Sequence, residues 1–196
     1  MLSSNLYLRS VAISKEIPKG NYLKDLPVVK NLTEMGSLSF SKNVTFLVGE
    51  NGVGKSTLIE AIAVAMGFNP EGGTKNFNFA TMESHSDLYT YMTMSRGFQR
   101  HRDGFFLRAE SFYNVASNID DMDKEMFGGP KIISSYGGVS LHKQSHGESF
   151  MALVENRFYG NGLYILDEPE AALSPMEMIE MHHFIVLLAE NNMMIN

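Results

Sequence analysis

Residues 49–57 leave this chain few possible folds, because their spacing of glycine, lysine and serine suits a single kind of loop. They read Gly-Glu-Asn-Gly-Val-Gly-Lys-Ser-Thr and match the pattern G-x-x-x-x-G-K-[ST], the phosphate-binding P-loop. Glycines let successive backbone N–H groups converge on a phosphate that side chains would otherwise block. The pattern therefore predicts a phosphate cradle that opens a helix, whose positive N-terminal end faces the anion.

Two side chains of this motif have predicted chemical roles. Lys55 supplies a positive charge for the β- and γ-phosphates, and the Ser56 hydroxyl is the predicted Mg²⁺ ligand. The predicted nucleotide-binding residues are Gly49, Asn51, Gly52, Gly54, Lys55, Ser56 and Thr57.

The residues on either side of the motif agree with it, because a P-loop connects a strand to a helix. The β-branched and aromatic run 44–48 predicts a buried strand. Residues 55–66 combine helix formers with apolar residues at helical spacing, and Gly67 follows as a C-terminal cap. A glycine-rich turn placed before a helix by chance would not explain both flanks.

The composition is that of a globular protein. The chain has 196 residues, enough for one domain, with 44% hydrophobic and 19% charged residues. Cysteine is absent, so disulfides and thiolate metal sites are excluded. A net charge of −6 argues against a broad nucleic-acid-binding surface, although nucleic acid stays possible through a local basic patch. The absence of any membrane-length apolar stretch or signal pattern favours a cytoplasmic protein.

The rest of the chain predicts strands that alternate with helices. Strands are expected over residues 6–13, 87–95, 104–108 and 162–166, and helices from near 111 and over 148–158 and 175–190. Residues 117–131 resemble a mobile acidic loop. This order around a P-loop predicts an α/β fold with a mostly parallel sheet flanked by helices.

One basic run is interpreted as a solvated loop that contains one functional arginine. It consists of Arg96, Arg100, His101, Arg102 and Arg108.

Two acids, Asp167 and Glu168, directly follow the apolar run 163–166. In P-loop NTPases such a strand lies beside the P-loop strand, so that its terminal aspartate reaches Mg²⁺. Asp167 is therefore the predicted metal ligand, and Glu168 is the predicted catalytic base that activates water. Acids after an apolar strand are otherwise ordinary loop residues, but their order after a P-loop favours the catalytic interpretation.

Residues 144–149 read Gln-Ser-His-Gly-Glu-Ser and precede a predicted helix. A serine followed by a glycine at such a position suits a second anion-binding helix start, or a simple N-cap turn.

These three elements, in this order, resemble the ABC-type ATPase superfamily. Residues 49–57 match Walker A, Asp167 and Glu168 match Walker B with its catalytic glutamate, and residues 171–174 look like the D-loop. A further resemblance is to the signature motif, at Ser145, His146, Gly147 and Glu148. The phrases at 105–112, 141–150 and 165–175 look most like small bacterial predicted ATPases of AAA/ABC type, related in style to RecF and SMC heads.

The resemblance implies ATP and Mg²⁺ as ligands and a homodimer formed on ATP binding. Two domains would pair head to tail around two ATP molecules, with Ser145 and Gly147 of one copy at the γ-phosphate held by Lys55 of the other. Glu110 occupies the position of the Q-loop glutamine, and Arg9 could stack near adenine or be a plain surface arginine.

The family also places a histidine after the strand that follows the last helix. The chain stops at Asn196, where that strand is expected, so we expect a single ABC-type ATPase domain over 1–196 that lacks its last strand and H-loop. His182 and His183 lie inside the predicted helix 175–190 and do not replace this histidine. ATP binding is expected to survive this departure more readily than turnover.

Several functions stay open. Mg-dependent ATP hydrolysis is favoured; a non-hydrolysing nucleotide-binding switch is supported by the missing histidine. Against the ATP-binding subunit of a transporter stand the Ser-His-Gly-Glu-Ser run in place of Leu-Ser-Gly-Gly-Gln and the missing Q-loop glutamine. A P-loop kinase is disfavoured by Glu168, because a kinase has no use for a base that activates water.

Overall fold

The computed structural model describes residues 6–74, 85–101, 103–125, 131–158 and 162–190. Its strands form two sheets. The first has the order β2-β1-β3 and is antiparallel, with β1 at Leu8–Ile13, β2 at Leu38–Ser39 and β3 at Met92–Arg96. The second pairs β4 (Asp103–Arg108) with β5 (Gly162–Asp167) in parallel.

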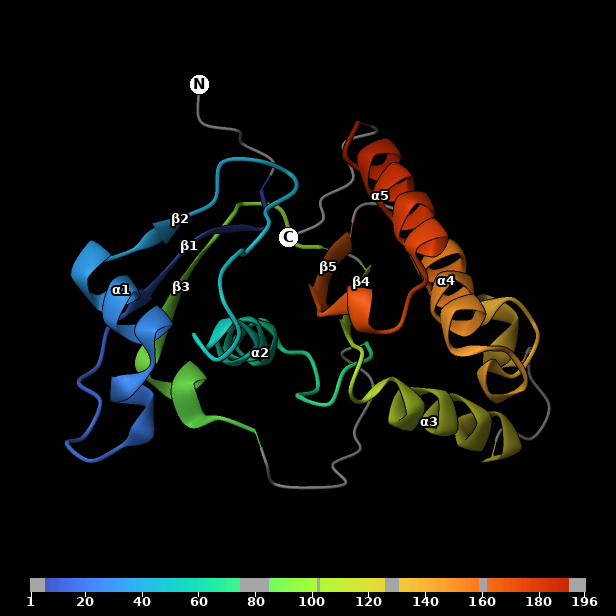
Figure 1. Cartoon of the computed structure of the whole chain (residues 1–196), viewed down its shortest axis with the longest axis horizontal. Helices are drawn as coiled ribbons and strands as arrows, with labels where there is room; N and C mark the ends of the chain where they lie inside the picture. Colours follow the sequence, from blue (N-terminus) through green and yellow to red (C-terminus); the bar gives the residue numbers. More distant parts are fainter. Residues whose placement is uncertain (1–5, 75–84, 102, 126–130, 159–161, 191–196) are drawn as a thin grey trace.

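Helices flank both sheets, as Figure 1 shows. The α-helices are α1 (Pro27–Met35), α2 (Lys55–Met66), α3 (Phe112–Glu125), α4 (His146–Arg157) and α5 (Pro175–Glu190). Short 3-10 helices connect them: η1 (Tyr22–Asp25), η2 (Asp87–Tyr91), η3 (Ile132–Tyr136), η4 (Leu141–Lys143) and η5 (Pro169–Ala171). The predicted α/β class with flanking helices is confirmed, and β4 and β5 form the expected parallel pairing. The sheet was predicted to be mostly parallel, but the three described strands β1, β2 and β3 pair antiparallel.

The parallel pair lies between two apolar clusters and supplies side chains to both. In β5, Leu163 and Ile165 pack with the cluster around β1 and α2, whereas Tyr164 packs with the cluster around α3, α4 and α5. In β4, Phe106 and its neighbour Phe105 divide in the same way. Successive side chains of a strand point to opposite faces, and parallel strands are buried on both. The ends of β4 and β5 are therefore held firmly at the edge of the core.

The predicted strand over 44–48 is wrong. These residues form no strand, and Phe46 and Val48 are 62% and 92% exposed. A strand exists through hydrogen bonds to a neighbour, and here a cavity of about 390 Å³ separates the run from Ile165 and Leu166 of β5. The run is apolar, as a strand would be, but it makes no strand pairing with β5.

The predicted strand over 87–95 is only half right. Its first part is η2, because the Ser86 hydroxyl accepts a hydrogen bond from the Leu88 N–H and caps a helical turn. Only the second part pairs with β1, as β3. The predicted strands 6–13 and 104–108 correspond to β1 and β4.

The predicted acidic loop over 117–131 is also wrong over most of its length, because α3 runs to Glu125. Val115, Ala116 and Ile119 are buried at helical spacing and hold it on the core. One of its acids has a structural use, since Asp120 accepts a hydrogen bond from Ser140 at 2.7 Å. Residues 126–130 lie outside the described residues.

Candidate functional site

The glycine-rich loop closes onto the start of α2. Gly52 and Gly54 have φ angles of 80° and 94°, in the left-handed region that glycine adopts most easily. A Cβ at Gly54 would also lie 2.8 Å from Val28 Cγ1. No side-chain hydrogen bond caps the N-terminus of α2, and the first N–H groups of this helix are directed at the loop. This arrangement can receive an anion through backbone donors and the helix dipole.

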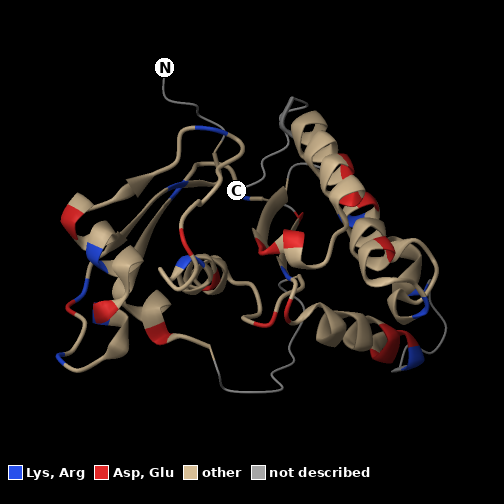
Figure 2. Ribbon diagram, viewed as in Figure 1, with Lys and Arg blue, Asp and Glu red and all other residues tan. Residues whose placement is uncertain are grey.

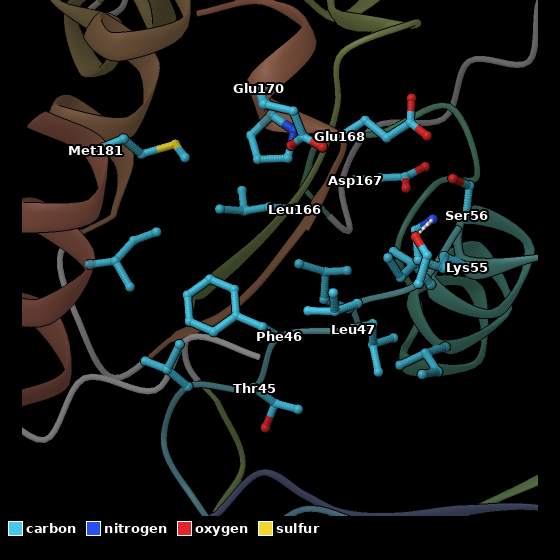
Figure 3. Close-up of a pocket in the computed structure, with 18 of the residues that line it drawn as sticks. Thr45, Phe46, Leu47, Lys55, Ser56, Leu166, Asp167, Glu168, Glu170 and Met181 are labelled. Atoms are coloured by element: carbon cyan, nitrogen blue, oxygen red, sulfur yellow. Dashed lines mark hydrogen bonds between the residues drawn. The ribbon is translucent and has the colours of Figure 1, made fainter. Parts of the chain in front are cut away.

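The Lys55 side chain folds back over the same loop. Its Nζ donates hydrogen bonds to the carbonyl oxygens of Gly49 and Glu50, each at 2.8 Å. Figure 3 shows Lys55 at the mouth of the cavity. The ammonium group is therefore held over the cradle by the loop itself, beside the N-terminus of α2.

Ser56 faces the end of β5 from the first turn of α2. Figure 3 shows its hydroxyl directed toward the carboxylate of Asp167, which is 5% exposed. Burial raises the pKa of Asp167 above its ordinary value, although a hydrogen bond from Ser56 and the nearby charge of Arg108 work in the opposite direction. The result is a carboxylate that is held in a site where its charge is not fully compensated.

These oxygen atoms suit Mg²⁺. Asp167 Oδ1 is buried and has no hydrogen-bond partner, and the Ser56 hydroxyl is a second hard oxygen donor next to it. Within the described ranges, no group of three or more His, Cys, Asp or Glu side chains could hold a metal. Mg²⁺ is ordinarily held by one or two protein oxygens, with phosphates and water as its other ligands, so this donor set fits it.

Glu168 follows Asp167 with an unusual backbone. Its φ of 51° lies in the left-handed region, which a non-glycine residue seldom occupies. Its exposed side chain extends toward the side on which Asp167 and Ser56 lie (Figure 3). Such conformations cluster at functional sites, where the surrounding fold maintains them. A carboxylate beside an open cavity can accept a proton from water.

The cavity brings together the predicted Walker residues from distant segments. Lys55, Ser56, Asp167 and Glu168 all line it, together with Gly49 and Asn51. Residues 145–148 do not line it. They form the N-terminus of α4, where Ser145 is the N-cap and makes a capping box with Glu148. The Ser145 hydroxyl hydrogen-bonds to the Glu148 carboxylate at 2.7 Å, and this contact lowers the pKa of Glu148.

Two other predicted site residues, Glu110 and Arg9, are not among the residues that line the cavity. Glu110 has a side chain that is 78% exposed and contacts Arg108 at 3.4 Å. Arg9 lies over the ring of Phe98, with its guanidinium carbon 4.8 Å from the ring centroid. The aromatic contact of Arg9 within the described residues is therefore with this protein's own side chain.

The sequence patterns do not predict the ion pair between Arg108 and Glu60, in which Nη1 of Arg108 lies 2.6 Å from Oε2 of Glu60. Arg108 is predicted only as a member of the basic run, and no role is predicted for Glu60. A glutamate among the apolar residues of 55–66 was the available signal, because a buried acid requires a partner. Arg102 of the same run lies outside the described residues.

The cradle, the helix it opens and the acid at the end of a parallel strand define a P-loop nucleotide-binding fold. The sequence profile of the AAA domain family matches residues 31–135, and the chain belongs to this family. The match contains residues 49–57 but ends before the signature-like residues and Asp167.

Two known proteins are similar to parts of the chain. The nisin transport ATP-binding protein NisT of Lactococcus lactis subsp. lactis is 27% identical over 183 residues, which is 81% of this chain and 29% of that protein. The structural maintenance of chromosomes protein 6 of Takifugu rubripes is 35% identical over 87 residues, or 40% and 8% of the respective lengths. The chain thus spans less than a third of either relative. No solved structure matches it significantly.

A search of the described helices for one that could cross a membrane found none of sufficient length and apolar character.

Proposed function

We propose that the chain binds Mg-ATP at residues 49–57 and hydrolyses it. The observation that carries this proposal is the meeting of Lys55 and Ser56 with Asp167 in one cavity, although more than a hundred residues of sequence separate them. Membership of the AAA domain family supports nucleotide binding at this loop.

Each side chain has a distinct task in this proposal. Lys55 exchanges its two loop carbonyls for the β- and γ-phosphate oxygens, and Ser56 with Asp167 holds Mg²⁺. When bound, Mg²⁺ neutralises charge on the phosphates. Glu168 accepts the proton of the attacking water from the open side of the cavity. The bond broken is that between the γ-phosphorus and the bridging oxygen, and ADP and phosphate are released.

The proposal includes a second copy of the chain. Residues 145–148 lie outside the cavity of their own chain but present a helix N-terminus, which suits an anion. Two copies arranged head to tail would place Ser145 and Gly147 of one at the γ-phosphate of the other. The dimer is thus a consequence of ATP binding, and the proposed compartment is the cytoplasm.

A second candidate is the ATP-binding subunit of a transport system. It is favoured by the alignment with a transport ATP-binding protein over 81% of this chain. In that case the nucleotide chemistry is the same, and turnover depends on a membrane partner.

The test of hydrolysis is ATP turnover by the chain and by Glu168→Gln, with Glu170→Gln as the matched control. Glu170 is a nearby exposed acid that also lines the cavity, so its loss changes the local charge equally. Loss of a general base lowers turnover by about 100- to 10,000-fold. Turnover that survives Glu168→Gln at the level of Glu170→Gln would remove Glu168 from the mechanism.

A further inference from the structure

We propose that Arg108 is a positioning residue that sets the Asp167 carboxylate opposite Ser56, with Glu60 as its anchor. The inference rests on the proposed function, because it concerns the two oxygen donors assigned to Mg²⁺. It gives a task to an arginine that does not itself face the phosphate cradle.

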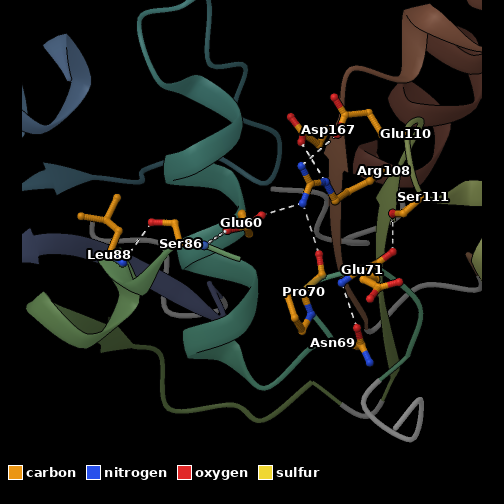
Figure 4. Close-up of polar contacts among 10 residues, drawn as sticks. All are labelled: Glu60, Asn69, Pro70, Glu71, Ser86, Leu88, Arg108, Glu110, Ser111 and Asp167. Atoms are coloured by element: carbon orange, nitrogen blue, oxygen red, sulfur yellow. Dashed lines mark hydrogen bonds and ion pairs between the residues drawn. The ribbon is translucent and has the colours of Figure 1, made fainter. Parts of the chain in front are cut away.

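Arg108 ends β4 directly beside the end of β5, where it pairs in register with Asp167. Its side chain is only 17% exposed. Nη1 lies 2.6 Å from Glu60 Oε2, and Nε lies 3.4 Å from Asp167 Oδ2 (Figure 4). Nη1 also donates a hydrogen bond to the carbonyl of Pro70 at 3.3 Å. The arginine is therefore held from several sides while one edge of its fork is turned to Asp167.

Glu60 makes this contact relevant to the metal site, because it lies one helical turn after Ser56. Residues i and i+4 of a helix share a face, so Ser56 and Glu60 face the same strand ends from α2. Both carboxylate oxygens of Glu60 are occupied, since Oε1 accepts the Ser86 N–H at 2.8 Å. Ser56 is thus connected to Asp167 through helix α2, Glu60 and Arg108, and the two proposed Mg²⁺ donors complete this ring of contacts. We infer that the ring fixes the separation of the two donors.

The charges explain why an arginine is needed at this position. Arg108 contacts three acids, Glu60, Glu110 and Asp167, and the first and last of these have side chains that are 9% and 6% exposed. Figure 2 shows acidic segments gathering between α2 and the end of β5. Without the guanidinium, these two buried carboxylates would both lose the counter-charge that they share. Asp167 would then no longer be held in its present orientation.

The contacts also assign the two oxygens of Asp167 different tasks. Oδ2 is the oxygen at Arg108, whereas Oδ1 is buried without a hydrogen-bond partner. The planar guanidinium can face Glu60 and Asp167 at once, because its donors form a rigid fork. A lysine ammonium is a point charge and cannot reproduce both contacts with the same geometry.

The test separates metal binding from nucleotide binding. ATP affinity is measured by calorimetry with EDTA present, and Mn²⁺ affinity of the ATP-bound protein is measured by electron paramagnetic resonance. The variants are Arg108→Met, Arg108→Lys and Glu60→Gln. The matched control is Arg157→Met, because Arg157 is also mostly buried, at 18% exposure, and ion-paired with Asp103 at 3.1 Å, away from the cavity.

We expect Arg108→Met to lower Mn²⁺ affinity by about 10- to 100-fold, as loss of a partner of a metal ligand does, while metal-free ATP affinity stays unchanged. Arg108→Lys should restore part of the Mn²⁺ affinity, and Glu60→Gln should lower it in the same direction. The double variant should bind Mn²⁺ no more weakly than Arg108→Met, since both changes open the same ring. Arg157→Met should change neither affinity.

Unchanged Mn²⁺ affinity in Arg108→Met would overturn the proposal, as would an equal fall in Mn²⁺ and metal-free ATP affinity, which indicates a packing role. If Arg108→Met fails to fold, Arg108→Lys and Glu60→Gln decide by the same two readouts. Failure of the unchanged chain to bind ATP would instead refute the proposed function, which keeps the two failures distinguishable.

Discussion

At the residue scale, Asp167 is a site residue whose ionised side chain lowers the stability of the fold. Its pKa is raised by burial, so the folded state favours its protonated form more than the unfolded state does. The corresponding stability is fully present below the unfolded pKa and is lost as the pH rises through the raised folded pKa. Above the raised pKa, the ionised carboxylate therefore lowers the stability of the fold, and a bound cation would relieve this cost.

We predict that Asp167→Asn raises the melting temperature of the nucleotide-free chain at pH 7, because the amide is neutral. A gain of about 1 kcal/mol corresponds to about 2–4 °C for a chain of this size. The difference from the unchanged chain should shrink as the pH falls through the raised pKa. Scanning calorimetry measures both effects, with Asp25→Asn as control, since the side chain of Asp25 is 89% exposed. A lower melting temperature for Asp167→Asn at pH 7 would contradict this reasoning.

The residues that line the candidate site could be predicted from the sequence, whereas the side chains that hold them in place could not. Lys55, Ser56, Asp167 and Glu168 were predicted because their chemistry is encoded in short local patterns. The pair of Glu60 and Arg108 was not, because the two side chains are 48 positions apart and meet only in the folded chain. Local patterns thus indicate which groups act on a ligand, whereas the side chains that orient them depend on tertiary packing.

The junction of α4 and α5 is the contact to test at the element scale. The Glu177 carboxylate closes the capping box of α5 by accepting the Ser174 N–H at 2.7 Å. Hydrogen bonds from the Ser174 hydroxyl and then from this N–H lower the pKa of Glu177. Gly147, in the first turn of α4, lies against that carboxylate, so a Cβ there would collide with it. The start of the signature-like helix is therefore fitted to the cap of the next one.

We predict that the effect of Gly147→Ala depends on Glu177. In a Glu177→Ala background, alanine should stabilise α4 by up to about 1 kcal/mol, because it is the better helix former. With Glu177 present, the collision displaces the cap, whose loss costs about 1 kcal/mol, and the gain should vanish or reverse. Urea denaturation of the four variants gives the coupling. An equal effect of Gly147→Ala in both backgrounds would show that the two helices are not fitted here.

The same contrast between local patterns and tertiary packing explains which helices and strands the sequence could predict. Helix α2 begins and ends where the P-loop and Gly67 indicated, at Lys55–Met66, and α5 begins at Pro175, as the capping box and proline indicated. The run 44–48 has strand composition but lacks a paired neighbour, so composition alone gave the wrong element. In α3 the acidic residues outweighed the helical spacing of the buried apolar ones. Local signals therefore located the helix ends that they mark, whereas strand pairing depends on residues distant in sequence.

At the scale of the whole molecule, the proposed function requires two copies of the chain. We predict that Glu168→Gln sediments as a dimer with Mg-ATP, because slowed hydrolysis preserves the γ-phosphate that bridges the copies. Without nucleotide the same variant should sediment as a monomer. Lys55→Ala with Mg-ATP serves as the control and should stay monomeric. A Glu168→Gln variant that binds ATP yet remains monomeric would refute the head-to-tail arrangement.

The central claim is that residues 49–57 and Asp167 form a Mg-ATP site, and calorimetric titration with Mg-ATP tests it most directly. Lys55→Ala is compared with Lys42→Ala, which removes an exposed lysine outside the cavity-lining residues. We predict that the unchanged chain and Lys42→Ala bind alike, and that Lys55→Ala binds about 10- to 100-fold more weakly, the effect of losing a charged hydrogen-bond donor. Equal affinity of Lys55→Ala and the unchanged chain, or no binding by the unchanged chain, would contradict the claim.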